Sequence, residues 1–296
     1  MCGDRRVKHH AAVRALRRTL TVLCGVLLLM VVFAGWGYYG ARADPIVRRA
    51  TISLPHWPTG KPPITVALLS DIHIGSPATD AARLGRVVDQ INALHPDLVL
   101  IAGDFIAGHE VATGRRYAAQ LTRPLAKLLA PLGTVAVLGN HDHWTSPEAV
   151  RTALQAAGIR VLANEAVERG PVAVVGIDDG FTGHADVGTS LAAANSLSGA
   201  RIVLTHSPDT AKGLPPGSAA LVLAGHTHCG QAMIPLIGPA VIDSPRLHRP
   251  LYEPRYRCGI IRDPGRIVVV TGGIGASLPL RYGAPPDIWL MIIGPS

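Results

Sequence analysis

Short, continuous runs of apolar residues recur along this chain, at residues 66–70, 98–102, 135–138, 202–205 and 221–224. Runs without alternation are typical of strands that other layers cover on both faces. Between the first two runs, apolar side chains recur every three or four residues from Leu84 to Leu94, which predicts a helix. The order strand, helix, strand over residues 64–140 is typical of an α/β fold.

Two further helices are expected from apolar spacing and from residues that start or end helices. One is predicted over residues 117–132, although Pro124 disturbs its start. The other follows Ser146, with Pro147 at its first position and Gly158 just beyond its end.

Beyond residue 172 the expected strands follow one another with fewer helices. Residues 256–262 and 267–271 flank an Asp-Pro-Gly-Arg turn and predict a hairpin, and residues 289–293 predict a last strand. Residues 46–54 predict an edge strand ahead of a proline-rich connector. We therefore expect a four-layer α-β-β-α sandwich, with two mixed sheets flanked by helices.

An uncharged stretch of 20 residues, residues 20–39, is long enough to cross a bilayer as one N-terminal transmembrane helix. Six Lys and Arg residues precede it, and Trp36, Tyr38 and Tyr39 lie at its far end. This bias predicts a cytoplasmic N-terminus, with the rest of the chain outside. A cleaved signal peptide is the alternative, because Ala41-Arg42-Ala43 has the form of a cleavage site. The length of the stretch favours an uncleaved anchor.

The chain therefore divides into four expected parts. They are a basic cytoplasmic tail (residues 1–19), a transmembrane anchor or signal segment (20–39), a linker with the edge strand (40–63), and a main domain (64–296). Seven basic residues and one acidic residue give residues 1–43 a charge of +6 out of the net +8. The remaining residues carry only +2, which gives no support to a nucleic-acid surface and leads us to expect no nucleic-acid partner.

Each apolar run ends on residue types that bind metal ions. The residues are Asp71 and His73 after the first run, Asp104 after the second, Asn140 after the third, His206 after the fourth, and His226 and His228 after the fifth. Because α/β folds place their chemistry at the carboxyl edge of the sheet, we expect these side chains to converge. Two divalent cations need about seven or eight protein ligands, including a shared carboxylate. Imidazole, carboxylate and amide ligands suit Mn, Zn or Fe and exclude a thiolate-type structural zinc site.

In chain order these residues form the series D-x-H, G-D, G-N-H-D, H and G-H-T-H, which resembles the calcineurin-like metallophosphoesterase family. The resemblance implies that residues 64–296 are the catalytic domain of a phosphoester hydrolase with two divalent metal ions. It implies this set of ligands: Asp71, His73 and His228 for one metal, Asn140, His206 and His226 for the other, and Asp104 bridging both. It also implies that a hydroxide between the metals attacks phosphorus, and that His141, held by Asp142, is the general acid or stabilises the transition state.

The segment Gly225-His226-Thr227-His228-Cys229-Gly230-Gln231 is similar to a membrane-anchored bacterial branch of that family, in which glycine is usual at the position of Cys229. The resemblance implies the bacterial inner membrane and a phosphoester or lipid-pyrophosphate substrate, with UDP-2,3-diacylglucosamine, a lipid A precursor, as the leading candidate. That precursor is made on the cytoplasmic side, which conflicts with a domain placed outside. The alternatives are a general exported phosphodiesterase or phosphatase and, in another class, a non-catalytic membrane-tethered binding protein.

Several other residues have simpler interpretations. Cys229 and Cys258 would pair in an exported domain, but two unpaired thiols are the preferred interpretation. Arg281 could neutralise a phosphate, whereas a surface salt bridge is the plainer account. His143 is assigned to a surface or loop position together with the other remaining histidines, and Trp144 beside it is not expected to touch substrate.

Overall fold

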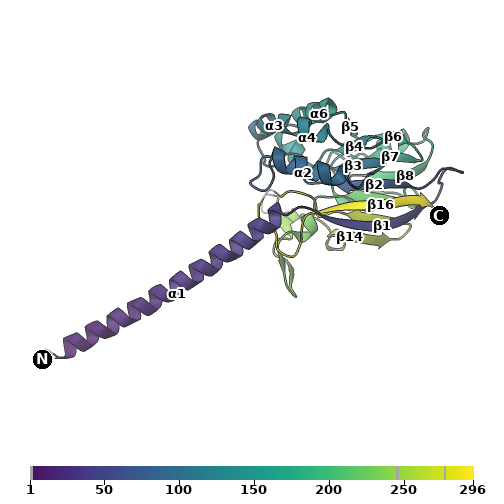
Figure 1. The fold of residues 1–296 in the computed structure, drawn as a ribbon. Helices are drawn as coiled ribbons and strands as arrows, with labels where there is room; N and C mark the ends of the chain where they lie inside the picture. The colour runs from purple at the N-terminus through teal and green to yellow at the C-terminus, as the bar shows by residue number, and fades with distance from the viewer. Residues whose placement is uncertain (1–2, 245–246, 277) are drawn as a thin grey trace.

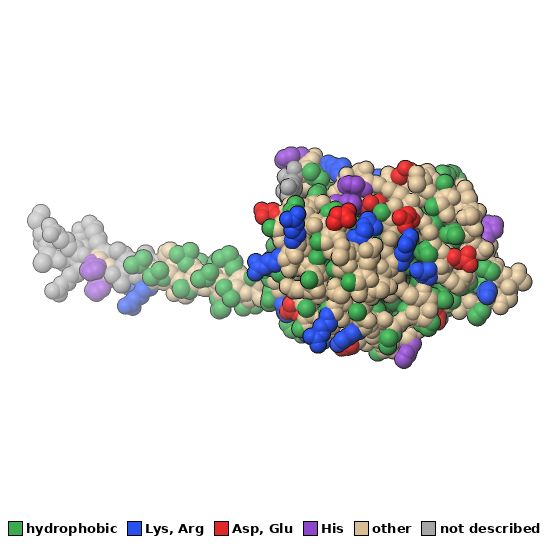
Figure 2. Space-filling model, turned by 90° about the horizontal axis from the view of Figure 1, so that it is seen from above, with side chains coloured by type: hydrophobic (Ala, Val, Ile, Leu, Met, Phe, Trp, Pro, Cys, Tyr) green, Lys and Arg blue, Asp and Glu red, His purple; other side chains and the backbone are tan. Residues whose placement is uncertain are grey.

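One long helix, α1 (Gly3–Arg42), projects from a layered body (Figure 1). The computed structural model describes residues 3–244, 247–276 and 278–296, so the first two residues of the expected tail lie outside the described part. Among the described helices, one stretch, Leu16–Arg42, is long and apolar enough to cross a membrane, and only 6% of its apolar window is buried. Figure 2 shows apolar side chains along α1 next to the body. A helix with an exposed apolar surface of this length is suited to lipid rather than water.

The first sheet has six strands in the order β1-β16-β2-β3-β4-β5. These are β1 (Ile46–Leu54), β16 (Asp287–Pro295), β2 (Ile64–Leu69), β3 (Leu98–Ala102), β4 (Thr134–Val137) and β5 (Arg160–Val161). β2 to β5 are parallel, whereas β16 is antiparallel to β2 and parallel to β1. The edge strand expected at residues 46–54 and the last strand are confirmed.

The second sheet has the order β14-β15-β9-β8-β7-β6. These strands are β14 (Gly259–Asp263), β15 (Arg266–Val270), β9 (Leu221–Ala224), β8 (Ala200–Leu204), β7 (Val172–Gly176) and β6 (Glu165–Arg169). The four central strands are parallel, and the two edge strands are antiparallel to their neighbours. The expected hairpin is confirmed as β14–β15.

Helices cover the outer faces of both sheets. The helices are α2 (Ala81–Asn92), α3 (Val111–Tyr117), α4 (Ala119–Leu125), α5 (Asn140–Thr145), α6 (Pro147–Ala156) and α7 (Val187–Ala193), with 3-10 turns η1 (Pro208–Gly213), η2 (His228–Gly230) and η3 (Pro254–Tyr256). In β2, Ala67 and Leu69 pack with the helices, while Val66 and Leu68 pack against the second sheet. Both faces of the strand are therefore buried, which confirms the four-layer sandwich and explains the continuous apolar runs.

The helix expected over residues 117–132 is wrong in its bounds. The helical region consists of α3 and α4 and ends at Leu125. Pro124 has no N–H for a helical hydrogen bond, and the chain leaves the helix directly after it. The start of this helical region at α3 was missed because Gly114 interrupts any apolar spacing. A Cβ at Gly114 would lie 2.8 Å from the backbone nitrogen of Ser146, so the close packing of α3 requires glycine.

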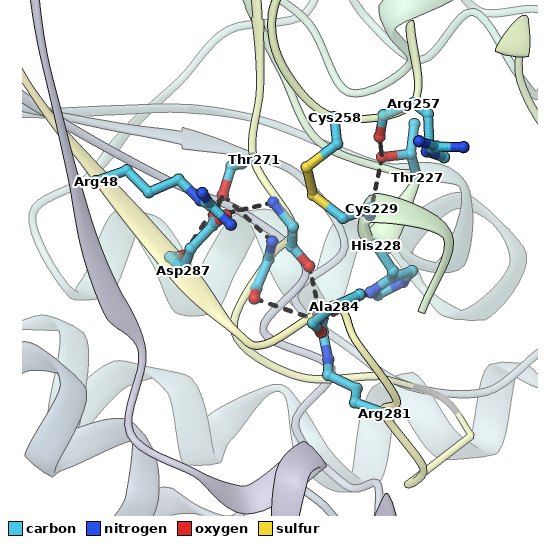
Figure 3. The surroundings of a disulfide bond; sticks show 12 residues. Arg48, Thr227, His228, Cys229, Arg257, Cys258, Thr271, Arg281, Ala284 and Asp287 are labelled. Carbon is cyan, nitrogen blue, oxygen red and sulfur yellow. Dashed lines mark hydrogen bonds and ion pairs between the residues drawn. A yellow bond between two sulfur atoms is a disulfide. The ribbon is translucent and has the colours of Figure 1, made fainter. Parts of the chain in front are cut away.

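Between β9 and β14 the chain makes a long excursion that carries two small hairpins, β10 (Met233–Ile234) with β11 (Gly238–Pro239), and β12 (Asp243–Ser244) with β13 (Arg249–Pro250). A disulfide between Cys229 and Cys258 joins the two ends of this excursion (Figure 3). The interpretation as two unpaired thiols is therefore wrong. The two cysteines are 29 residues apart in sequence, and only the pairing of β9, β15 and β14 in one sheet brings them together.

Candidate metal centre

The seven expected metal ligands lie at the carboxyl edge of the two sheets, in or directly after the turns that follow β2, β3, β4, β8 and β9. Five of them have a backbone in the left-handed region: Asp71 (φ 51°), His73 (φ 49°), Asp104 (φ 58°), His226 (φ 70°) and His228 (φ 49°). Residues other than glycine rarely adopt this conformation. Such strain persists only where the surroundings hold it, and it concentrates at functional sites.

Asp71, His73 and His228 form one group of converging ligand atoms. Nε2 of His228 lies 3.4 Å from Oδ1 of Asp71 and 3.3 Å from Nε2 of His73. The Asp71 side chain is fully buried, and its Oδ1 has no hydrogen-bond partner among the described residues. An unpartnered buried carboxylate oxygen is costly. Its position beside two imidazole nitrogens therefore fits a cation.

The second group consists of Asp104, Asn140, His206 and His226. Nε2 of His206 lies 3.2 Å from Oδ2 of Asp104, 3.1 Å from Oδ1 of Asn140 and 3.2 Å from Nδ1 of His226. The other ring nitrogens face backbone carbonyls: Nδ1 of His206 faces Ala102 at 2.7 Å, and Nε2 of His226 faces Leu251 at 2.9 Å. Because a carbonyl only accepts, each ring carries a proton on the nitrogen that faces its carbonyl, and the other nitrogen of each ring points to the position where a metal would bind.

Asp104 lies between the two groups. Its Oδ2 is 3.2 Å from Nε2 of His206 in one group and 3.6 Å from Nε2 of His73 in the other. Its Oδ1 accepts the backbone N–H of His141 at 2.8 Å. A carboxylate in this position can reach two cations at once, as the shared ligand of a dinuclear centre must.

Charge and burial inside the site favour ionised carboxylates and a neutral His228, but a protonated His206. Burial acts to raise the pKa of Asp71 and of Asp104, but the nearby histidines outweigh it and lower both pKa values below the ordinary range. Burial lowers the pKa of His228 to about 3. His206 differs, because Asp104 outweighs the effect of burial and raises the pKa of its ring. Ionised carboxylates and neutral imidazoles are the forms that bind cations, so metal binding at His206 would release a proton.

His141 lies beside both groups, and its ring packs edge-on against that of His73 at a centroid distance of 4.8 Å. Its Nδ1 is 2.7 Å from the carbonyl oxygen of Gly108, and this oxygen accepts a hydrogen bond from Nδ1–H. Asp142 does not hold this ring in any hydrogen bond seen among the described residues. Its carboxylate instead accepts three backbone N–H groups, from Phe105, Ile106 and Gly139. The expectation that Asp142 holds His141 is therefore corrected. Consecutive residues of a helix point in different directions, and the Asp142 carboxylate instead fixes the turn after β3.

Arg281 is a buried residue of the site and not part of a surface salt bridge (Figure 3). Its guanidinium donates to the carbonyl oxygens of Gly272 at 2.7 Å, Gly275 at 2.6 Å and Ala284 at 3.1 Å. Its Nη2 also lies 3.1 Å from Nδ1 of His228. When Nε2 of His228 binds a cation, the ring proton is on Nδ1, which then cannot accept a hydrogen bond. In that state the Arg281 guanidinium bonds only the carbonyl oxygens. Arg281 thus fixes the closing loop against a candidate ligand.

A pocket of about 420 Å³ opens over the two groups. Its larger apolar and aromatic lining residues are Trp144, Phe181, Val241, Leu251, Tyr252 and Leu278. Trp144 also packs edge-on against the ring of His141 at 5.1 Å. An apolar pocket beside charged groups suits a substrate with an apolar part. Trp144, which was not expected to touch substrate, thus lines the pocket. No sequence motif marks these residues, because their loops come from separate parts of the chain.

His143 lies in α5 and its side chain is mostly buried, so its assignment to a surface or loop position is wrong. Its Nε2 lies 2.8 Å from Oδ1 of Asp178, and both side chains are about nine-tenths buried. Burial alone would lower the pKa of His143, but the hydrogen bond and charge of Asp178 outweigh burial and raise it. The pair joins α5 to the loop after β7, so it supports the site from outside.

This sandwich, with carboxylates and histidines converging at its edge, defines the class of a metal-dependent hydrolase. Residues 64–230, more than half of the chain, match the calcineurin-like phosphoesterase family. The chain therefore belongs to the calcineurin-like phosphoesterase family.

Three curated relatives support this assignment. The chain is 30% identical over 285 residues to the transmembrane protein with metallophosphoesterase domain of Danio rerio, covering 90% of this chain and 61% of that protein. It is 29% identical over 282 residues to the uncharacterized metallophosphoesterase YkuE of Bacillus subtilis, covering 92% and 95%. It is 29% identical over 237 residues to the phosphodiesterase YaeI of Escherichia coli, covering 77% and 82%. The chain thus spans less than two thirds of the Danio rerio protein.

Proposed function

We propose that this protein is a membrane-anchored phosphodiesterase with two divalent cations, Mn, Zn or Fe, shared by the seven residues above. One cation would lie between Asp71, His73 and His228, the other between Asn140, His206 and His226, with Asp104 bridging. The observation that carries the proposal is the convergence of both groups on the Asp104 carboxylate, beside the unpartnered Oδ1 of Asp71. The phosphodiesterase of Escherichia coli supports the reaction class.

The cations would supply Lewis-acid activation of water and of the phosphoryl oxygens. The chain's own contribution beyond ligation comes from His141. Because Nδ1 of His141 donates to Gly108, its Nε2 is the ring atom that can exchange a proton with the leaving oxygen. Burial lowers the pKa of His141 to about 4. A bound phosphate brings negative charge that opposes this effect of burial on the pKa of His141.

The proposed substrate is a phosphoester or pyrophosphate of an amphiphile in the membrane, and the proposed location is the outer side of the bacterial inner membrane. The uncharged stretch of α1 and the apolar pocket support the first statement. The basic tail and the Cys229–Cys258 disulfide support the second, since disulfides persist in oxidising compartments. UDP-2,3-diacylglucosamine remains a named candidate, but an outer site argues against a lipid made on the cytoplasmic side.

The test uses the purified full chain in detergent, loaded with Mn²⁺ or Zn²⁺ and assayed on bis-p-nitrophenyl phosphate, p-nitrophenyl phosphate and UDP-2,3-diacylglucosamine. We expect two bound metal ions and hydrolysis of the diester. Asp104→Ala should lose both metals and the activity. Asp97→Ala, at the opposite end of β3, is the matched control and should keep both. Full metal content in Asp104→Ala would refute the bridging role, and bound metal without hydrolysis of any substrate would favour a non-catalytic binding protein.

A further inference from the structure

The first small hairpin of the excursion presents an apolar surface without any charge. Residues 230–242 contain no acidic, basic or histidine side chain. At its tip, Leu236 is fully exposed and Ile237 is 80% exposed, and Ile234, Val241 and Ile242 are between 43% and 52% exposed. We call residues 233–242 the apolar hairpin. Single exposed apolar residues are ordinary, but a continuous group of five marks a contact surface.

The base of the apolar hairpin is joined to α1 through Tyr282. The backbone N–H of Met233 donates to the Tyr282 carbonyl at 2.9 Å. The Tyr282 ring stacks on that of Phe33 at 4.3 Å and meets Trp36 edge-on at 5.6 Å, and its hydroxyl donates to the Phe33 carbonyl at 3.0 Å. Gly37 permits this approach, because a Cβ there would lie 2.3 Å from the Tyr282 ring. The hairpin therefore starts at the level of residues 33–37.

That level lies within the uncharged stretch of α1. Phe33 is nine residues, or about 13 Å of helix, before the end of α1 at Arg42. In Figure 1 a pale green loop projects from the body beside the end of α1. When α1 crosses a bilayer, the base of the apolar hairpin therefore lies beside the last turns of the spanning stretch.

The segment that carries the apolar hairpin also borders the pocket over the candidate metal centre. Ala232, Val241 and Leu251 line this pocket together with His141 and Trp144. Part of the pocket lining and the exposed apolar side chains thus belong to one disulfide-closed excursion.

We propose that the apolar hairpin is a second, shallow membrane contact, which holds the pocket against the lipid surface so that a phosphoester head group enters directly from the bilayer. The occupant of this surface is the acyl region of a phospholipid leaflet. The statement about head-group entry rests on the proposed function, whereas the membrane contact itself does not.

The membrane contact is tested with the full chain in vesicles of phosphatidylcholine and phosphatidylglycerol. In a background without Cys2 and Cys24, Leu236→Cys carries an environment-sensitive fluorophore, and some lipids carry a nitroxide at a shallow or a deep acyl carbon. We expect a blue shift and stronger quenching by the shallow nitroxide. Fluorescence as in water, without quenching, would overturn the proposal.

Leu129→Cys is the matched control, since Leu129 is an exposed leucine (68%) away from α1. Its backbone N–H bonds Asn92 at one end of α2, whereas Arg42 of α1 pairs with Asp80 at the other end, about 18 Å away along the helix. The label there should show no shift and no quenching. Equal quenching at both positions would also overturn the proposal, because it would reflect non-specific adsorption.

Head-group entry is tested with the double variant Leu236→Asp and Ile237→Asp. Neither residue lines the pocket. The probes are bis-p-nitrophenyl phosphate in solution and an acylglycerol p-nitrophenyl phosphodiester dispersed in the vesicles. We expect a loss of about tenfold or more on the vesicle probe and unchanged hydrolysis of the soluble probe. Head-group entry would be overturned if the double variant hydrolysed both probes at the parent rate. It would also be overturned if the variant lost activity by the same factor on both probes. If the parent protein hydrolyses neither probe, the proposed function fails, while the quenching result still decides the membrane contact.

Discussion

The Cys229–Cys258 disulfide carries a quantitative prediction about stability, because it closes the excursion that borders the site. Replacing both cysteines with serine frees this segment in the unfolded chain. For a sequence separation of 29 residues, the loss of loop-closure constraint corresponds to about 3.6 kcal/mol of unfolding free energy. In a domain of this size, that loss lowers the melting temperature by about 7–14 °C.

The backbone at Cys229 supplies a second, opposing contribution. Cys229 has φ 55°, in the left-handed region where an L-residue other than glycine is strained by about 1–2 kcal/mol. Glycine relieves that strain, so Cys229→Gly with Cys258→Ser should be more stable than the double serine variant by about 1 kcal/mol. Cys24→Ser, which removes an exposed free thiol, is the matched control and should leave stability unchanged.

The measurement is thermal unfolding of the full chain in detergent, followed by tryptophan fluorescence with and without reductant. Reductant should lower the melting temperature of the parent and of Cys24→Ser, and it should have no effect on either double variant. Alkylation under denaturing, non-reducing conditions should modify only Cys2 and Cys24. Four modified cysteines, or a parent whose melting temperature reductant does not change, would refute this reasoning and with it the structural support for an oxidising compartment.

Three further predictions concern the site and its supports. His141→Ala should keep both metals and lower kcat by about 10²–10⁴-fold; loss of metal by elemental analysis would instead identify it as a ligand. Arg281→Met leaves three buried carbonyls without their donor and should cost about 3–5 kcal/mol in denaturant unfolding, so an unchanged midpoint would contradict its clamping role. Asp178 raises the pKa of His143 in the folded state above its value of about 6.5 in the unfolded chain. The pair therefore stabilises the fold fully below a pH of about 6.5, and this stabilisation is lost as the pH rises through the raised pKa. His143→Gln should therefore lower the melting temperature more at about pH 6 than at about pH 9, and a pH-independent loss would show that the charge plays no part.

The layers of the fold were predictable because the central strands of both sheets are buried on both faces. A strand such as β3, with every residue from Leu98 to Ala102 buried, must appear in sequence as a continuous apolar run. The convergence of the candidate ligands followed from the same runs, since each ended on a polar residue at the same edge. The exact helical bounds around Pro124 did not follow, because close packing at Gly114 decided them.

The supports of the site depend on contacts that no local pattern encodes. Asp142 and His141 are adjacent in sequence, yet their side chains serve different turns. Arg281 bonds carbonyls of a loop whose path is set by β15 and β16, so its burial was invisible from its neighbours in the chain. Interactions of this kind require the tertiary arrangement, and they are the ones that the sequence interpretation assigned wrongly.

Arg281 and Tyr282 together connect the membrane helix, the apolar hairpin and the candidate metal centre. The backbone N–H of Arg281 donates to Gly37 of α1 at 2.9 Å, while its side chain reaches His228. Tyr282 packs on Phe33 and hydrogen-bonds the strand that leads into the hairpin. Removal of α1 therefore exposes the Tyr282 ring and takes away a backbone hydrogen bond of Arg281, whose side chain lies beside His228. A fragment without the anchor therefore has a different site from that of the intact protein. α1 contributes to the structure of the candidate metal centre as well as placing it at the membrane.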